Sequence, residues 1–232
     1  MTAEQAFLLR ILADHLNGVN TELTADIDWK VLNIIAKQQQ VSAIVYYQTK
    51  NPLLQSAFAH QVYHAKNQEV LLDKVRTGLS NASISYIFVK GVEIKKYYPR
   101  PELRSMGDAD LIVSLEDKPN ADMILEQIGF TKTAETNEWV YIKGDFEVEL
   151  HHALAYEKDS FANEQRLNDF WPYVKDNHLD MGFHFVYLLF HLRRHLFAHG
   201  AGFRQFMDIA LVCKNGEINW KWVREELRKE SK

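Results

Sequence analysis

The chain has 232 residues, of which 47% are hydrophobic and 12% aromatic, enough for one compact domain or two small lobes and too apolar for a disordered chain. The net charge is −4 and the basic residues are dispersed, so no basic stripe indicates extended nucleic acid as a partner. Cys213 is the only cysteine, and no apolar run approaches the ~18 residues of a membrane span, so we expect a cytoplasmic protein without a disulfide or a membrane partner.

Residues 1–80 are predicted to be helical. Phe7 and Ile11 recur at the spacing of one helix face, and Asp26 or Asp28 is placed to cap a second helix that begins near Trp29. Further helices are expected over residues 41–47 and from about residue 52 to residue 79.

The pattern changes at Ser83, where short β-rich runs begin. Two prolines, Pro99 and Pro101, end a helix that starts after Gly91, and Gly129 is a plausible end for another. The expected elements are strands at 84–89 and 108–114, helices at 92–98 and 119–128, and a hairpin of residues 138–143 and 146–151.

The last part of the chain is again helical, with predicted helices at 181–198, 203–214 and 220–229. We therefore predict an α+β fold, a small mixed β-sheet between helical flanks. The expected parts are an N-terminal helical part (1–80), a core with the functional site (81–155) and a C-terminal helical part (156–232).

The most informative motif is Asp108-Ala109-Asp110, which is followed at once by the apolar run Leu111-Ile112-Val113. Side chains alternate along a strand, so both carboxylates point to the same side of it. Paired carboxylates suit a hard cation such as Mg²⁺, which prefers oxygen ligands and keeps positions open for phosphate oxygens. The motif alone is common, and its setting on a buried strand strengthens the prediction of a metal site.

The second strand of the hairpin offers a further carboxylate. Glu147, Glu149 and His151 share the face opposite the apolar side chains of this strand. Three carboxylates around divalent ions form a site suited to in-line displacement at phosphorus. An ordinary solvated acidic face is the alternative, and it is the favoured interpretation for Glu147.

Several segments together carry a resemblance to a known family. They are a strand followed by Lys90-Gly91 and a helix, then residues 104–111 and 148–151, with flanks at 29–47, 191–195 and 203–210. These segments resemble the uncharacterised nucleotidyltransferase family of the DNA polymerase β-like superfamily.

The resemblance implies a metal-dependent transfer of a nucleoside monophosphate from an NTP to an acceptor hydroxyl on a small molecule, a protein or an RNA end. By position, Asp108 and Asp110 would be the paired ligands of Mg²⁺ or Mn²⁺, and Glu149 the third carboxylate. Gly91 would lie in the turn where the backbone approaches the triphosphate.

Basic and histidine side chains complete the candidate site. Lys90 and Arg104 are candidates for binding phosphate, the latter because its guanidinium fork can grip two oxygens. His151 is a candidate for orienting Glu149. His195 is a candidate for lining an acceptor cleft, where Arg193 or Arg194 would contact ligand phosphate. His191, His195 and His199 recur every four residues, so a histidine metal site is a weaker hypothesis.

A second class of function stays open. Val92 follows Gly91 where the superfamily often has glycine or serine. This departure motivates the alternative that the chain is a catalytically degenerate nucleotide-binding or interaction module on the same fold. Catalysis requires all three carboxylates, whereas binding can survive the loss of one, so Glu149→Gln separates the two hypotheses.

Overall fold

The computed structural model describes residues 1–23, 26–136, 138–156, 164–198 and 200–229. The chain divides into two compact units. Unit 1 comprises residues 1–67, 95–105 and 200–215, and unit 2 comprises residues 68–94, 106–199 and 216–232. Each unit therefore combines segments that are far apart in the sequence, whereas the sequence predicted three consecutive parts.

Unit 1 is helical, as predicted for the N-terminal residues. The Asp28 side chain caps one of its helices by accepting hydrogen bonds from the backbone N–H groups of Lys30 and Val31, which confirms the second of the two predicted caps. Its elements are α1 (Ala3–Asn17), α2 (Trp29–Gln38), α3 (Ser42–Thr49), η1 (Pro52–Leu54), the first half of α4 (Gln55–Asn81), η2 (Lys95–Tyr97), η3 (Pro101–Leu103) and α8 (Phe203–Asn215).

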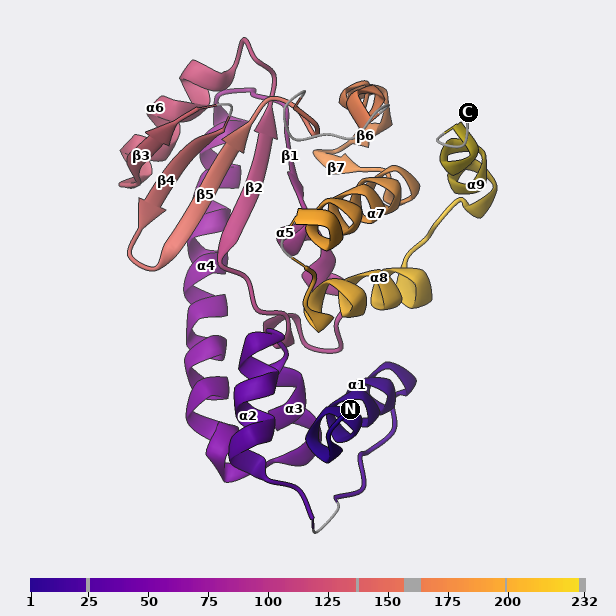
Figure 1. Cartoon of the computed structure of the whole chain (residues 1–232). Coiled ribbons are helices and arrows are strands. Elements are labelled where there is room, and N and C mark those ends of the chain that lie inside the picture. Colours follow the sequence, from indigo (N-terminus) through magenta and orange to yellow (C-terminus); the bar gives the residue numbers. More distant parts are fainter. Residues whose placement is uncertain (24–25, 137, 157–163, 199, 230–232) are drawn as a thin grey trace. The chain divides into compact units, whose positions relative to one another are not determined.

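Unit 2 contains a five-stranded mixed sheet in the order β1-β2-β5-β4-β3, which confirms the α+β class (Figure 1). Only β2 and β5 run parallel; the other neighbouring strands are antiparallel. The strands are β1 (Tyr86–Val89), β2 (Asp108–Val113), β3 (Thr131–Glu135), β4 (Trp139–Lys143) and β5 (Phe146–His151).

One face of this sheet is the hydrophobic core of unit 2. The second half of α4 and the helix α6 (Lys118–Ile128) pack there, and their buried leucines contact alternate residues of the strands. Figure 1 shows α4 running behind the sheet and α6 beside β3. The core residues of the two strands that carry the predicted carboxylates are Ala109, Leu111, Val113, Phe146, Val148 and Leu150.

The remaining elements of unit 2 lie after β1 and after β5. They are α5 (Gly91–Ile94), η4 (Glu164–Asn168), η5 (Trp171–Tyr173), the small hairpin β6 (Val174–Lys175) and β7 (His178–Leu179), α7 (Met181–Ala198) and α9 (Trp220–Arg228). Helix α9 packs on α7 through aromatic contacts, among them the stacked rings of Phe183 and Trp222. Within the described residues, no helix combines the length and the apolarity that crossing a membrane requires.

Two features of the sheet region differ from the prediction. Strand β3 was missed because Thr131–Glu135 has no apolar alternation; it is an edge strand whose residues are half-buried or exposed. The helix predicted over 92–98 is shorter, because α5 ends at Ile94 and a 3₁₀ turn, η2, takes over.

Candidate active site

The parallel pairing of β2 with β5 sets the geometry of the carboxylates. Apolar residues of both strands point into the core, so the alternating polar residues must point to the opposite face. The polar residues of the two strands therefore stand side by side, as the sequence predicted for neighbouring strands. The register places Asp108 beside Glu147, Asp110 beside Glu149, and Ile112 beside His151.

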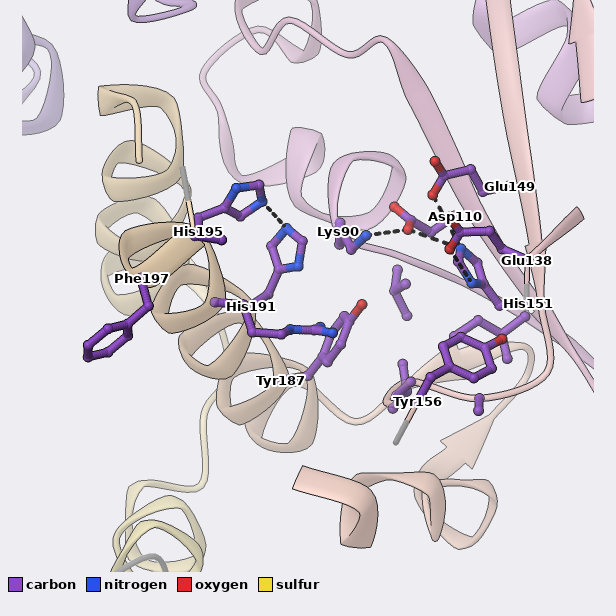
Figure 2. A pocket seen from close by; sticks show the side chains of 16 residues that line it. Lys90, Asp110, Glu138, Glu149, His151, Tyr156, Tyr187, His191, His195 and Phe197 are labelled. Carbon is purple, nitrogen blue, oxygen red and sulfur yellow. Dashed lines mark hydrogen bonds and ion pairs between the residues drawn. The ribbon is translucent and has the colours of Figure 1, made fainter. Parts of the chain in front are cut away.

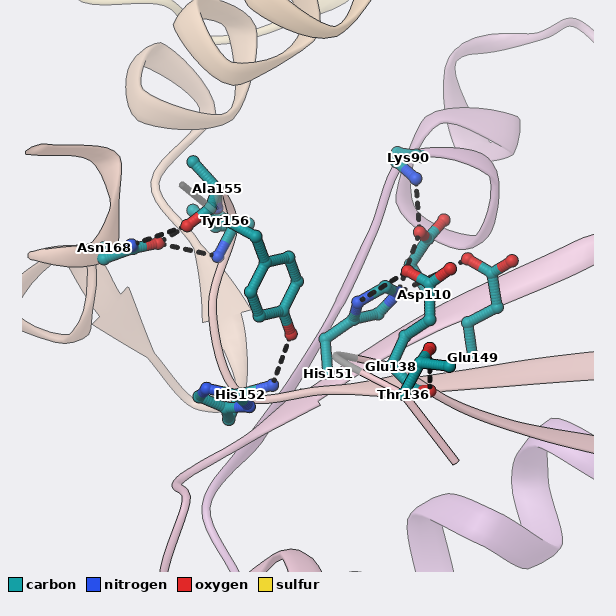
Figure 3. Close-up of polar contacts among 11 residues, drawn as sticks. Lys90, Asp110, Thr136, Glu138, Glu149, His151, His152, Ala155, Tyr156 and Asn168 are labelled. Carbon is teal, nitrogen blue, oxygen red and sulfur yellow. Dashed lines mark hydrogen bonds and ion pairs between the residues drawn. The ribbon is translucent and has the colours of Figure 1, made fainter. Parts of the chain in front are cut away.

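Asp110 is the centre of a connected polar cluster (Figure 3). Its carboxylate is 3% exposed and forms an ion pair with the ammonium group of Lys90. His151 Nε2 lies 3.4 Å from Asp110 Oδ1 and 3.4 Å from Glu149 Oε2, and its Nδ1 lies 3.6 Å from Glu138 Oε2. One ligand atom from each of Asp110, Glu149 and His151 lies within 4.8 Å of the others, close enough to share one cation.

The charges in this cluster are strongly coupled. Burial alone would raise the pKa of Asp110. Lys90 and His151 lower it by more than burial raises it, so the net pKa lies well below the usual range. Burial lowers the pKa of Lys90, yet Asp110 outweighs it and holds the pKa above its usual value. The pKa of His151 is also raised, because its contacts with Asp110 and Glu149 outweigh burial. Asp110 and Lys90 are therefore both charged at neutral pH.

Asp108 is a carboxylate whose pKa is raised by its surroundings. Burial and then the negative charge of Asp110 raise its pKa, and Glu149 adds to this, while Lys90 opposes it. It lines a second, smaller hollow that also includes Glu147. Repulsion among three neighbouring carboxylates is an arrangement that a divalent cation relieves.

The turn between β1 and α5 differs in detail from the expectation. Lys90 adopts a left-handed conformation with φ 50°, which is strained for a residue with a side chain. Its backbone N–H donates a 2.9 Å hydrogen bond to Nε2 of the buried His184 on α7. The following Gly91 is buried and begins α5, and it is not among the residues that line the cavity described next.

The cluster opens into a cavity of about 750 Å³ (Figure 2). The sheet forms one wall and helix α7 the other, as Figure 2 shows for the labelled side chains. Polar and aromatic side chains dominate both walls. They include Lys90, Asp110, Glu149 and His151 on one side, Tyr187, His191, Arg194 and His195 on the other, and Glu138 and Tyr156 near the loop after β5.

The loop after β5 is held in place by Asn168 of η4. Its side chain accepts hydrogen bonds from the backbone N–H groups of Leu154 and Ala155, at 2.9 and 3.0 Å, and donates one to the carbonyl of Ala155. The Tyr156 hydroxyl accepts a hydrogen bond from the backbone N–H of His152 (Figure 3). These contacts fix Tyr156 at the edge of the cavity.

The histidines of α7 are partly as predicted. His191 and His195 both line the cavity, and their Nε2 atoms are 2.9 Å apart. Burial and then the charge of Lys90 hold the pKa of His191 well below its usual value, so this imidazole is neutral. His199 lies outside the described residues.

The two arginines of α7 share one buried carboxylate. Glu164, which is 1% exposed, accepts a 2.8 Å hydrogen bond from Arg193 Nη2, and its Oε2 lies 3.9 Å from Arg194 Nε. Arg193, the predicted cleft residue, is not among the lining residues; its guanidinium packs on Phe190. Its neighbour Arg194 lines the cavity instead.

The environment of Arg104 differs from the one expected of a phosphate ligand. Arg104 belongs to unit 1, where its Nε and Nη2 atoms donate to the two carboxylate oxygens of Asp208 at 3.0 and 2.9 Å. The hydroxyl of Tyr98 donates to the same carboxylate at 2.8 Å. Both partners of the ion pair are buried, so the guanidinium already has a bidentate anionic partner in the protein.

Residues that line the cavity but were not predicted from the sequence include Tyr156, Tyr187 and Glu138. Tyr187 precedes His191 by four residues, a helical spacing that could have placed it on the same face. No pattern in the sequence indicates Glu138, because its place beside His151 depends on strand pairing.

Comparisons with known proteins bear on this arrangement. A family model described as an uncharacterised nucleotidyltransferase matches residues 25–230. A solution structure of the antibiotic-resistance factor ANT(2'')-Ia is similar at 12% identity and a TM-score of 0.52, covering 72% of this chain and 94% of that chain. A crystal structure of ANT(2'')-Ia in complex with adenylyl-2''-tobramycin is similar at 14% identity and a TM-score of 0.52, covering 72% of this chain and 99% of that chain. At these identities the likeness shows the fold. Among curated proteins there is no match.

Proposed function

The chain belongs to the uncharacterised nucleotidyltransferase family, and we propose that it transfers a nucleoside monophosphate from an NTP to an acceptor hydroxyl. In this reaction the acceptor oxygen forms a bond to the α-phosphorus, the bond from that phosphorus to the bridging oxygen breaks, and pyrophosphate leaves. The reaction depends on a divalent cation, Mg²⁺ or Mn²⁺. We assign the cation to Asp108, Asp110 and Glu149.

The observation that supports this proposal most directly is the register of β2 and β5. It holds three carboxylates on one face of the sheet, and Asp110 and Glu149 face the cavity. Oxygen donors are the ligands that Mg²⁺ prefers. The raised pKa of Asp108, caused by burial and by Asp110, indicates excess negative charge that the nearby Lys90 does not fully offset. The donor set and the charge both fit a divalent cation.

Each residue of the cluster has a proposed task. When bound, a divalent cation would neutralise triphosphate charge and lower the pKa of an acceptor hydroxyl. Glu149, at the cavity, accepts the proton that the acceptor hydroxyl loses. His151 orients both Asp110 and Glu149, since its Nε2 lies 3.4 Å from each.

Lys90 is the proposed phosphate ligand of the cluster. Its side chain is held on Asp110 and at the cavity wall, and its positive charge persists at neutral pH. A triphosphate that enters the cavity brings a second anionic partner within reach of this ammonium group. Lys90 thus links the nucleotide to the carboxylate cluster, while Gly91 contributes the first helical turn that follows it.

The cavity supports a small-molecule acceptor over a protein or RNA. About 750 Å³ lies within the range of roughly 300–1,000 Å³ that small-molecule sites occupy. The aromatic rings of Tyr156 and Tyr187 supply apolar surface, and the polar groups on α7 supply hydrogen-bonding partners for an acceptor.

The test compares the protein with its Glu149→Gln variant. Each is incubated with NTPs and Mg²⁺ in an extract of small metabolites, and mass spectrometry searches for products heavier by one nucleoside monophosphate. We expect such a product, with stoichiometric pyrophosphate, from the native protein alone. Equal product from Glu149→Gln contradicts the catalytic role of Glu149. Nucleotide binding without any product from either protein favours a binding module instead.

A further inference from the structure

Two histidines on the helical wall of the cavity form a pair to which the proposed reaction assigns no catalytic task. His191 and His195 are four residues apart on α7, so they lie on the same face of the helix. Their rings are 4.5 Å apart between centroids and inclined by 80°, and their Nε2 atoms face one another at 2.9 Å (Figure 2).

This separation is the one that two ligands of a single metal ion have. Zinc binds imidazole nitrogen at about 2.0–2.1 Å, so two nitrogens that subtend roughly 90–110° at the ion lie about 2.9–3.4 Å apart. The observed 2.9 Å lies at the lower edge of that range. A small widening of the pair would bring it to the tetrahedral value.

The chemistry of the pair favours borderline transition metals over Mg²⁺. Imidazole suits Zn²⁺, Cu²⁺ and Ni²⁺, whereas Mg²⁺ selects oxygen ligands. Coordination requires a neutral imidazole with a free lone pair, and burial among positive neighbours keeps His191 neutral. The pair and the carboxylate cluster therefore select different cations.

The position of the pair leaves room for further ligands. Both histidines line the cavity of about 750 Å³, on the wall opposite Asp110 and Glu149. We propose that His191 and His195 bind a borderline divalent transition-metal cation, Zn²⁺ being the expected one. The remaining coordination positions of that cation face the cavity, where water or a donor atom of a bound molecule completes them. This inference does not depend on the proposed function.

A second pair in the chain provides a matched control. His60 and His64 on α4 are also four residues apart, and their Nε2 atoms are 3.0 Å apart. Of these two histidines in unit 1, His60 is exposed and His64 is half-buried. The two pairs thus share ligand spacing and differ in surroundings, so removing each pair in turn locates the ion.

The experiment is a calorimetric titration with Zn²⁺ in excess Mg²⁺. We expect the native protein and His60→Gln/His64→Gln to bind Zn²⁺ alike, and His195→Gln to lose at least roughly tenfold in affinity at one site. Gln can still hydrogen-bond to His191, so a pair that is only hydrogen-bonded would survive this change. The variant Asp110→Asn/Glu149→Gln should retain the site, because its ligands lie on α7.

A spectroscopic arm keeps the proposal testable if His195→Gln does not fold. In the His60→Gln/His64→Gln background, Cu²⁺ should give an electron paramagnetic resonance spectrum with coupling to two imidazole nitrogens. An oxygen-only spectrum, unchanged zinc affinity in His195→Gln, or loss of zinc in Asp110→Asn/Glu149→Gln would each overturn the proposal.

Discussion

Each of the two units contains a buried aspartate that forms an ion pair with a basic side chain, and the two aspartates differ in what surrounds them. Asp208 in unit 1 holds Arg104 in a bidentate pair and also accepts from Tyr98. Asp110 in unit 2 holds Lys90 but shares its face of the sheet with further carboxylates and opens onto a cavity.

This difference separates a structural ion pair from a candidate functional site. The Asp208 pair is satisfied within the protein, because Nε and Nη2 of Arg104 donate to the two carboxylate oxygens. Around Asp110, the carboxylates of Asp108 and Glu149 lie near the ion pair with Lys90, and burial and then Asp110 raise the pKa of Asp108. Residual charge beside a cavity is what a metal–nucleotide complex can neutralise.

The largest expected effect follows from Asp110→Asn. The variant removes one charge from the proposed cation site, so nucleotidyl transfer should fall by about 10²–10³-fold or more. Product formation in the metabolite assay measures it, with circular dichroism to verify folding. The matched change Asp208→Asn should leave the turnover of the folded protein unaltered; a comparable loss there would break the distinction between the two aspartates.

Arg104→Met should lower stability and leave the nucleotide site intact. The variant leaves the buried carboxylate of Asp208 without its guanidinium partner, which should lower the free energy of unfolding by about 3–5 kcal/mol. Urea denaturation measures that loss. If stability were instead unchanged while affinity for NTP fell, the sequence-based assignment of Arg104 to phosphate would be right after all.

His184→Phe tests the support of the Lys90 turn. An aromatic ring is kept, but the backbone N–H of Lys90 loses its acceptor, which should cost about 1–3 kcal/mol in the free energy of unfolding. Thermal or urea unfolding gives the number. A variant as stable as the native protein would show that this hydrogen bond does not hold the turn.

The smallest expected effect is that of Asp108→Asn, which should stabilise the folded protein where the two preceding variants destabilise it. Because the pKa of Asp108 is raised on folding, its carboxyl stabilises the folded state below its ordinary pKa, and this contribution is lost as pH rises through the folded pKa. Asp108→Asn should therefore modestly increase the free energy of unfolding at neutral pH without metal, and the gain should vanish in acid. A variant that is less stable at neutral pH would mean that the carboxylate is not strained by its neighbours.

The opposite rule applies to Asp110, whose pKa is depressed. Its stabilising contribution is present above its ordinary pKa and is lost as the pH falls through the folded value. In Lys90→Met the Asp110 pKa is no longer held down, so the free energy of unfolding should be lower at neutral pH and should fall less on acidification than in the native protein, as urea unfolding at several pH values measures. An equal pH dependence in the two proteins would contradict the coupling of these two residues.

The sequence predicted those parts of the site that depend on local periodicity. Period two placed Asp108 and Asp110 on one face of a strand and Glu149 and His151 on one face of another, and the structure confirms these faces. The helices and the hairpin followed from similar short-range patterns. That the two strands are neighbours was a hypothesis, because local periodicity does not determine strand pairing.

Partners that are distant in the sequence could not be predicted. Arg104 and Asp208 are separated by 104 positions, and no local rule joins them. Arg104 was interpreted as a phosphate ligand because it lies near the metal motif in the sequence. The sequence near Arg104 does not indicate that a distant carboxylate, Asp208, pairs with it. The contact of Glu138 with His151 depends on the same kind of long-range pairing.

In the proposed function, the carboxylate cluster binds nucleotide through a divalent cation. The most direct test is calorimetric binding of the four NTPs, with and without Mg²⁺, to the native protein and to Asp108→Asn/Asp110→Asn. We predict binding that requires Mg²⁺ and that the double variant loses while remaining folded. Nucleotide binding that is equally strong without Mg²⁺ or in the double variant would contradict the central claim.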